Sequence, residues 1–212
     1  HNIIADFDKN LVLKKKTVRH HPTFTDDKTI KILLEAIDNY SGETVTRYAL
    51  KITPYLALRP IELRSLQWDY INFKDNFIVI PANKMKMRLE HIIPITSTVM
   101  KMIKELQEFT GDKKYLFANA VYKDRYMSEN TVNVALRRMG FSKDEIVAHG
   151  FRSMFSTIAH EKSNFKPHVI ETQLAHSVGN SVSQAYNRAK YLDERVELMQ
   201  WWSDYLERLI HG

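Results

Sequence analysis

The sequence predicts a mostly α-helical domain with one small three-stranded antiparallel sheet. Apolar residues recur at helical spacing along most of the chain. This period is interrupted once, where three short β-type runs occupy residues 71–73, 77–80 and 91–95. The hydrophobic fraction is 44% and the charged fraction 26%, so a chain of 212 residues carries enough apolar material for a packed core.

Two helices and a short third one are expected ahead of the strands. The first begins near Thr25, with Gly42 as a plausible stop, and the second ends close to Arg59. Pro60 opens the short helix, which runs to Leu66, because proline fits the first turn of a helix. The expected inward residues of the two longer helices are Ile30, Leu33, Leu34 and Ile37, followed by Val45, Tyr48, Ala49, Ile52, Tyr55 and Leu56.

Four further helices are expected after the strands. One is closed by Gly111, the next is capped by Ser128 and ends at Gly140, a third is opened by Pro167, and the last spans 192–209. Their expected inward residues are Val99, Met102, Ile103, Leu106 and Phe109; Val132, Ala135, Leu136 and Met139; Val169, Ile170, Gln173 and Leu174; and Val196, Met199, Trp202, Tyr205 and Leu209.

Charge and composition restrict the class of protein. The net charge of +6 is compatible with a polyanionic partner. The absence of cysteine excludes disulfides, thiolate metal sites and a cysteine nucleophile, and it agrees with a reducing compartment. There is no long apolar run and no signal-like start, so we expect a protein of the bacterial cytoplasm with no membrane contact.

Basic residues indicate where a polyanion would bind. Residues 1–22 are expected to form a basic linker or arm, and residues 23–212 a single domain. The connection between the second and third strands, residues 84–88, is also strongly basic. The residues expected to contact phosphates are Lys14, Lys15 and Lys16 in the arm and Lys84 and Arg88 in this connection.

Two arginines are candidates for phosphate chemistry. A phosphodiester concentrates negative charge on its non-bridging oxygens in the transition state, and a guanidinium group can bind two oxygens at once without a metal. Arg59 lies in the run Leu-Arg-Pro-Ile-Glu-Leu, and Arg152 closes the run His-Gly-Phe-Arg. Each is next to an apolar helical segment that could hold it rigidly, although either one taken alone could equally be a surface arginine.

Two further residue types, histidine and lysine, could transfer the protons that breaking a phosphodiester requires. His149 could hydrogen-bond the phosphate and accept a proton from the nucleophile, or it could simply be the first residue of a helix. Lys86, in the basic connection, could donate a proton to a leaving 5′ oxygen. Lys84 has the same strand parity and competes for that role, and the whole connection could instead be a solvated turn or a phosphate contact.

Tyr186 is the candidate nucleophile, ten residues after His176. A covalent phosphotyrosine would store the energy of the broken bond, so neither ATP nor a cofactor is needed. Tyr191 and Tyr205 are rival nucleophiles among the 10 tyrosines of the chain. Tyr205 falls on the apolar stripe of the last helix and is therefore expected in the core.

Taken together, these residues resemble the catalytic domain of the tyrosine recombinases, the phage integrase family, and above all the integrases of prophages and genomic islands. Residues 58–68 are similar to the first-arginine motif of the family, and residues 83–95 to its β-hairpin lysine segment. The run at 149–152 is similar to the HxxR box. Residues 173–176 and 185–188 are similar to the second-histidine and nucleophile segments, and the register favours Lys86 over Lys84.

The resemblance implies a fold, a reaction and a set of roles. The reaction would be site-specific recombination of DNA, for integration or excision of a mobile element, with neither metal nor cofactor. In the family's arrangement the scissile phosphate would be surrounded by Arg59, His149, Arg152 and His176. Lys86 would protonate the leaving oxygen, and Tyr186 would form the 3′-phosphotyrosine. Glu62 would support the site.

The resemblance also implies partners. The substrate would be double-stranded DNA at attachment sites, and the protein, a monomer when free, would act on it as a homotetramer with accessory DNA-bending proteins. The helix at 192–209 could pack on a neighbouring protomer or on its own domain. Such enzymes usually carry a further helical domain ahead of the catalytic one, and only residues 1–22 precede it here, so we expect weak, salt-sensitive DNA binding.

Three other functions compete with this hypothesis. A type IB topoisomerase uses similar residues to relax supercoils. A non-catalytic helical DNA-binding module would need only the basic charge. A histidine metal site is the third, although His149, His160, His168 and His176 lack the carboxylate and cysteine pattern that such a site would need.

Overall fold

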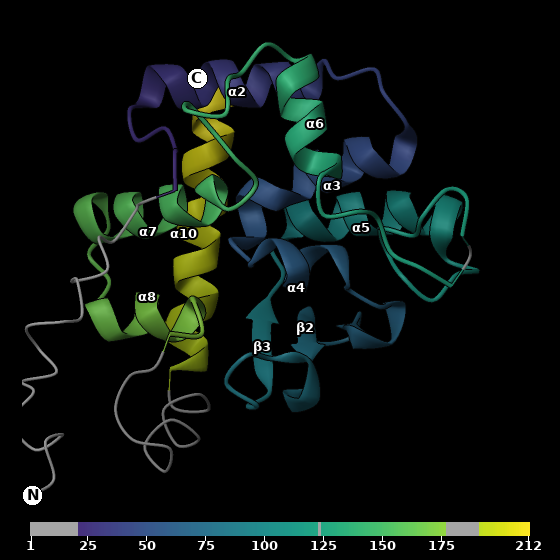
Figure 1. Cartoon of the computed structure of the whole chain (residues 1–212). Coiled ribbons are helices and arrows are strands. Elements are labelled where there is room, and N and C mark those ends of the chain that lie inside the picture. The colour runs from purple at the N-terminus through teal and green to yellow at the C-terminus, as the bar shows by residue number, and fades with distance from the viewer. Residues whose placement is uncertain (1–20, 123, 177–190) are drawn as a thin grey trace, which may run out of the picture.

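Helix α3 (Thr44–Leu56) lies at the centre of the fold. We describe the computed structural model over residues 21–122, 124–176 and 191–212. In this part of the chain α3 packs against neighbours that come from both halves of the sequence (Figure 1). These neighbours are α2 (Asp27–Asp38), α5 (Ser97–Thr110), α6 (Thr131–Arg138), α7 (Gly150–Lys162) and α10 (Leu192–His211).

The sheet has the three antiparallel strands that the sequence predicts, in the order β1, β2, β3. Its strands are β1 (Ile71–Asn72), β2 (Phe77–Ile80) and β3 (His91–Pro94). Ile78 pairs with Ile71 on one side and with Ile93 on the other, and all three side chains are buried. This row of isoleucines is the face of the sheet that joins the core.

Short elements connect the sheet and the longer helices. Helix α4 (Pro60–Arg64) follows α3, as Pro60 predicts. Helix α8 (Pro167–Gln173) follows α7 and packs against it. The 3-10 turns η1 (Trp68–Tyr70) and η2 (Ala82–Lys84) flank the strands.

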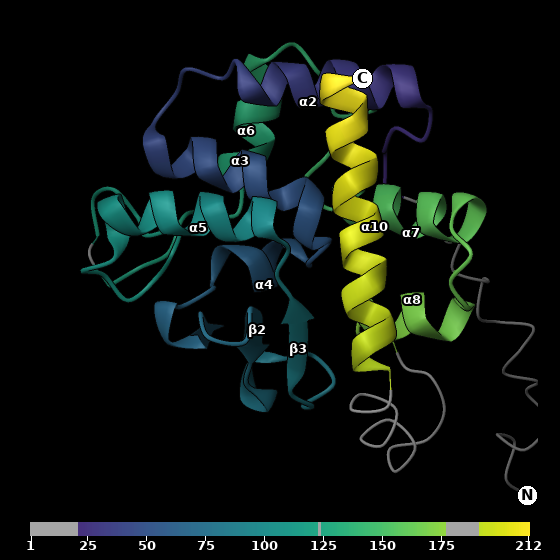
Figure 2. The ribbon, with the colours of Figure 1, turned by 180° about the vertical axis from the view of Figure 1, so that it is seen from behind.

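Helix α10 joins the two sides of the molecule. Figure 2 shows it running between α7 and α8 on one side and α3, α5 and β3 on the other. Trp202 is fully buried, and its indole N–H donates to the Pro54 carbonyl of α3 at 2.9 Å. Arg195 is also fully buried; it donates to Gln173 Oε1 of α8 at 2.9 Å and to the Ile92 carbonyl of β3. Of the two packing modes left open by the sequence, the structure has the one on its own chain.

Several predicted boundaries and inward faces were wrong in detail. Helix α2 ends at Asp38 and not at Gly42, and α6 begins after Asn130, although Ser128 does contact Thr131 at 3.0 Å. Phe109 is 49% exposed, because it lies at the far end of α5, and Met100 is buried instead. Val196 is 41% exposed, because the buried face of α10 is centred on Leu198, Trp202 and Leu206.

Candidate active site

The turn that ends α8 is the point at which the site is assembled. The His176 N–H donates to the Glu171 carbonyl at 3.0 Å, and the Ala175 N–H donates to the Thr172 carbonyl at 3.0 Å. Ala175 has φ = 48°, so the two bonds form a Schellman turn with alanine in the left-handed position usually taken by glycine. The turn leaves the Leu174 and Ala175 carbonyls available to other donors.

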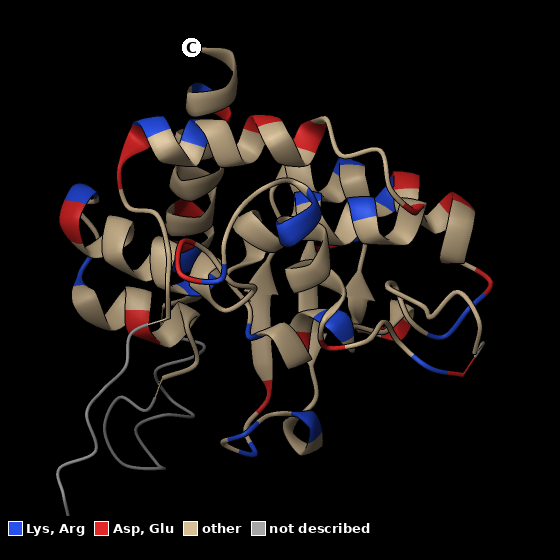
Figure 3. Ribbon diagram, turned by 45° about the horizontal axis from the view of Figure 1, so that its top comes forward, with Lys and Arg blue, Asp and Glu red and all other residues tan. Residues whose placement is uncertain are grey.

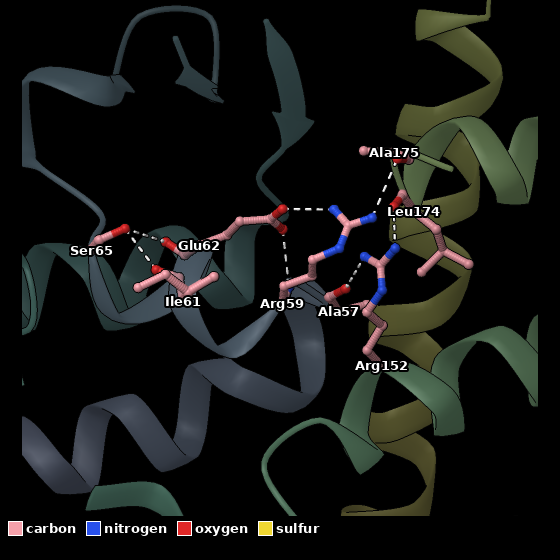
Figure 4. A network of polar contacts seen from close by, with 8 residues as sticks. All are labelled: Ala57, Arg59, Ile61, Glu62, Ser65, Arg152, Leu174 and Ala175. Atoms are coloured by element: carbon pink, nitrogen blue, oxygen red, sulfur yellow. Dashed lines mark hydrogen bonds and ion pairs between the residues drawn. The ribbon is translucent and has the colours of Figure 1, made fainter. Parts of the chain in front are cut away.

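Arg152 is held by backbone carbonyls from two sides. It is 4% exposed, and its guanidinium donates to the Ala57 carbonyl at 3.1 Å and to the Leu174 carbonyl (Figure 4). Ala57 closes α3 with φ = 51°, the left-handed region again. Two helix ends with unusual backbone geometry therefore supply the acceptors for one buried cation.

Arg59 is fixed by Glu62 and by the same turn. Its Nη1 lies 2.6 Å from Glu62 Oε1, its own N–H donates to Glu62 Oε2 at 3.0 Å, and its Nη2 donates to the Ala175 carbonyl at 3.4 Å. Glu62 is buried at 5% exposure and completes a capping box at the start of α4. Figure 4 shows the guanidinium groups of Arg59 and Arg152 side by side against the α8 turn.

The proximity of these cations affects the pKa of Arg152. Burial, followed by the charge of Arg59, lowers the pKa of Arg152 to about 10, although Glu62 and Glu171 act in the opposite direction. Two guanidinium groups repel each other when they are close and partly desolvated. An anion placed between them would relieve this repulsion and could accept hydrogen bonds from both.

His149 adjoins the arginines at the start of α7. Burial, followed by the charges of His21, Arg152, Arg59 and His176, lowers the pKa of His149 to about 4. The imidazole is therefore neutral near pH 7, and it can accept a proton there.

Residues 21–23, which we call the N-terminal strap, cover the start of α7. The His21 ring lies over the His149 ring with 4.0 Å between the centroids. The Thr23 hydroxyl donates to the Gly150 carbonyl at 2.7 Å, and a Cβ added to Gly150 would overlap the Pro22 carbonyl oxygen. Glycine at position 150 thus allows the strap to lie against His149.

The comparison of the sequence with known proteins identifies its family. The family model described as the phage integrase family matches residues 23–192. The chain belongs to the phage integrase family. It is 36% identical over 209 residues to an integrase of Enterobacteria phage P4, covering 92% of this chain and 47% of that protein. It is 38% identical over 177 residues to an integrase of Shigella phage Sf6, covering 83% and 46%.

Solved structures of integrases share the fold. An integrase from mycobacterium phage Brujita superposes with a TM-score of 0.64 at 13% identity, covering 94% of this chain and 66% of that one. A lambda integrase tetramer bound to a Holliday junction gives a TM-score of 0.58 at 18% identity, covering 81% and 52%. The chain spans about half the length of the two phage relatives above.

The integrase fold brings five of the expected site residues together at the α8 turn. His149 lies within electrostatic reach of Arg59, Arg152 and His176, the two arginines are within reach of each other, and Glu62 binds Arg59 directly. Three of the four basic groups come from helix ends: Arg59 from the start of α4, His149 from the start of α7 and His176 from the turn that ends α8. The sequence indicated these residues by their type and order, without any signal of how they would be held.

The remaining expected residues lie apart from this cluster or outside the described residues. Lys84, Lys86 and Arg88 are exposed on the connection between β2 and β3, which carries several basic residues in Figure 3. No contact among the described residues brings the Lys86 amine to the two arginines. Tyr186 lies outside the described residues, and so do Lys14, Lys15 and Lys16.

The rival tyrosines can be located. Tyr205 is 6% exposed, its hydroxyl donates to Asp27 Oδ1 at 2.6 Å, and it belongs to the core as predicted. The Tyr191 ring packs against His168 with 4.5 Å between the centroids. The hydroxyl of Tyr205 therefore has a structural role in the core. An experiment is needed to decide whether Tyr191 or Tyr186 is the nucleophile.

Several residues of the site were not found from the sequence. The strap residue His21 lay in a segment that the sequence predicted to be a basic arm. Glu171 belonged to no sequence motif that indicated a function. Ala57 and Ala175 gave no sign of left-handed backbone, which is usually marked by glycine. Only Gly150, directly after a candidate catalytic histidine, offered a signal for a close backbone approach.

Other features of the described residues bear on alternative functions. A cavity of about 320 Å³ opens between α2, α3, α5 and the end of α10, and it contains none of the candidate site residues. No group of three His, Asp or Glu side chains in the described ranges is arranged to hold a metal ion. None of the described helices has the length and apolar character that crossing a membrane requires.

Proposed function

We propose that this chain is the catalytic part of a site-specific tyrosine recombinase that integrates or excises a mobile DNA element. One observation carries the proposal: Arg59 and Arg152 meet His149 at the α8 turn, which concentrates positive charge beside a neutral base. Such a site suits a phosphodiester anion, because guanidinium groups stabilise the charge that develops on its non-bridging oxygens.

In the proposed reaction the Tyr186 hydroxyl attacks the phosphorus of one DNA strand. A bond forms between phosphorus and the tyrosine oxygen, and the bond between phosphorus and the 5′ oxygen breaks. The tyrosine proton passes to His149, whose low pKa keeps it neutral and able to accept. Lys86 supplies the proton that the leaving 5′ oxygen needs. A 5′ hydroxyl from a partner strand then reverses the step, so no cofactor is consumed.

The surrounding residues position the phosphate. Glu62 and the α8 turn restrain Arg59, while two helix ends restrain Arg152, so both guanidinium groups are set before DNA arrives. Preorganised donors of this kind cost little reorganisation during the reaction. His176 would donate to, or accept from, the same phosphate.

The proposed partners are attachment-site DNA and further copies of the chain. Lys84 and Arg88 on the β2–β3 connection, together with Lys14, Lys15 and Lys16, would contact phosphates on either side of the scissile one. The chain would act as a tetramer on DNA, which the lambda integrase tetramer of the same fold supports, and it would be a monomer when free and use accessory DNA-bending proteins. The reaction would take place in the bacterial cytoplasm, where its DNA substrate lies.

A covalent trapping assay tests the proposal. A nicked suicide substrate containing the attachment site loses its 5′ end after cleavage, so the protein–DNA adduct accumulates and survives SDS. We expect an adduct with the parent chain and with Tyr191→Phe, and none with Tyr186→Phe.

The result has clear alternatives. Loss of the adduct only in Tyr191→Phe would assign the nucleophile to the other tyrosine. Relaxation of supercoiled DNA without joining of two duplexes would indicate a topoisomerase. Binding without an adduct, for the full-length protein on its own attachment site, would reject the proposed enzyme in favour of a DNA-binding module.

A further inference from the structure

We propose that Glu171 is a positioning residue for His176, and that His160 in turn holds Glu171. The inference rests on the proposed function, because His176 is one of the residues assigned there to the phosphate. It adds two residues that the sequence did not single out, and both belong to helices already fixed in the core.

Glu171 binds His176 through both its backbone and its side chain. Its carbonyl accepts the His176 N–H at 3.0 Å, and its Oε2 lies 2.6 Å from His176 Nδ1. The first bond belongs to the Schellman turn whose carbonyls hold the two arginines. The second bond fixes the rotation of the imidazole relative to that turn.

The chemistry of the contact also fixes the proton of the ring. An ionised carboxylate only accepts hydrogen bonds, so the Nδ1 of His176 must be the nitrogen that carries the proton. This leaves Nε2 as the nitrogen available to a substrate. Positioning carboxylates act in this way behind many functional histidines, because the bond selects the tautomer and the orientation together.

The other carboxylate oxygen is held from α7. Glu171 Oε1 lies 3.4 Å from His160 Nε2, and this contact becomes an ion pair whenever His160 is protonated. His160 Nδ1 lies 2.7 Å from the Ser156 carbonyl, which can only accept, so this nitrogen carries a proton. Nε2 can therefore donate to Glu171 only when both ring nitrogens carry a proton, and in that state the chain of contacts runs from the α7 backbone through His160 and Glu171 to His176.

Burial indicates what these contacts contribute. The side chains of His160, Glu171 and His176 are 33%, 31% and 44% exposed, so solvent screens their charges. Their value to the site is geometric, since each contact removes one rotational freedom from the next side chain. Glu171 also acts on Arg152, whose pKa it raises against the larger effect of burial.

The test uses nitrogen-15 NMR of the histidine rings in this chain without DNA, with the His176 signals assigned from His176→Gln. In the parent chain we expect the proton of neutral His176 on Nδ1. In Glu171→Ala the proton should move to Nε2 or exchange between the two nitrogens. Glu171→Gln should keep the parent pattern, because its amide oxygen can still accept the bond. Glu161→Ala, which removes an exposed carboxylate from α7, is the matched control.

A second readout measures function. We expect Glu171→Ala to slow adduct formation on the suicide substrate about tenfold, with Glu171→Gln restoring most of the rate and DNA affinity unchanged. His160→Ala should have a smaller effect in the same direction. An unchanged tautomer in Glu171→Ala would overturn the inference. If neither the parent chain nor the full-length protein on its own attachment site forms an adduct, the proposed function fails, while the tautomer measurement still decides the role of Glu171.

Discussion

At the scale of single residues, the site depends on cations that are held in place by neutral carbonyls. Arg152 makes its described hydrogen bonds to the Ala57 and Leu174 carbonyls and so keeps its full charge for a substrate anion. Arg59 is bound to Glu62, which offsets part of the repulsion between the guanidinium groups. These partners fix the conformation of both guanidinium groups and still leave the site with a net positive charge.

The planar fork of Arg152 is predicted to matter as much as its charge. In Arg152→Lys the positive charge remains, but one ammonium cannot reach both carbonyls and a phosphate with the same geometry. We expect adduct formation to fall by roughly a hundredfold or more. Single-turnover cleavage of the suicide substrate measures this, and near-normal rates in Arg152→Lys would show that charge alone suffices.

The low pKa of His149 makes a prediction about pH. Its pKa is about 4 in the folded protein and near 6.5 when unfolded, so the unfolded state binds more protons between these values. Stability from this group is therefore complete above pH 6.5 and is lost as the pH falls towards 4. The full shift corresponds to about 3 kcal/mol at about 1.4 kcal/mol per pKa unit, and solvent around the partly exposed ring reduces the loss below that value.

Removing the strap histidine tests the cause of this shift. In His21→Ala the neighbouring ring is lost, which both exposes His149 to water and removes a neighbouring charge. Both changes raise the pKa of His149 towards its ordinary value, as an NMR titration of the ring would report. His168→Ala, which alters a histidine whose ring packs against Tyr191, is the control, and an unmoved His149 pKa in His21→Ala would contradict the explanation.

At the scale of elements, α10 is the clearest case in which packing could not be read from the sequence. An apolar stripe at 192–209 is equally compatible with a neighbouring protomer and with the helix's own domain. The structure shows Trp202 and Arg195 fully buried against α3, α8 and β3, so the helix completes the core of its own chain. The inward face is broader than a single stripe because α10 has neighbours on two sides.

Substitutions in α10 should follow this packing. Trp202→Ala is expected to lower the free energy of unfolding by about 3–5 kcal/mol, because a large buried side chain leaves a cavity. Val196→Ala, on the exposed side of the same helix, should change it by less than about 0.5 kcal/mol. Denaturant unfolding measures both, and a small effect of Trp202→Ala would mean that α10 is not part of the core in solution.

Other elements were predicted correctly because their signals are local. Pro60 opens α4, short β-type runs mark the strands, and Ile30, Leu33 and Leu34 lie on the buried face of α2. The turns at Ala57 and Ala175 were beyond prediction, since left-handed alanine has no sequence signature. Those turns hold the arginines, so residue types revealed the candidate site while its geometry came only from the fold.

At the scale of the whole molecule, the basic residues of the β2–β3 connection should act through long-range electrostatics. Lys84 and Arg88 are exposed, so each would release about one counterion on contacting a DNA phosphate. Lys84→Ala and Arg88→Ala should each weaken binding and reduce the slope of log affinity against log salt by about 1. Lys113→Ala, which replaces a basic residue outside the connection, is the control. An unchanged slope in both test variants would show that the β2–β3 connection does not contact DNA.

The central claim is that Tyr186 attacks DNA at the cluster formed by Arg59, His149 and Arg152. The most direct measurement is peptide mass spectrometry of the covalent adduct after nuclease and protease digestion. We expect a nucleotide attached through phosphate to the tyrosine in the segment Ala185–Tyr186–Asn187. A modification on Tyr191, or no modified peptide after reaction of the full-length protein with its own attachment site, would contradict it.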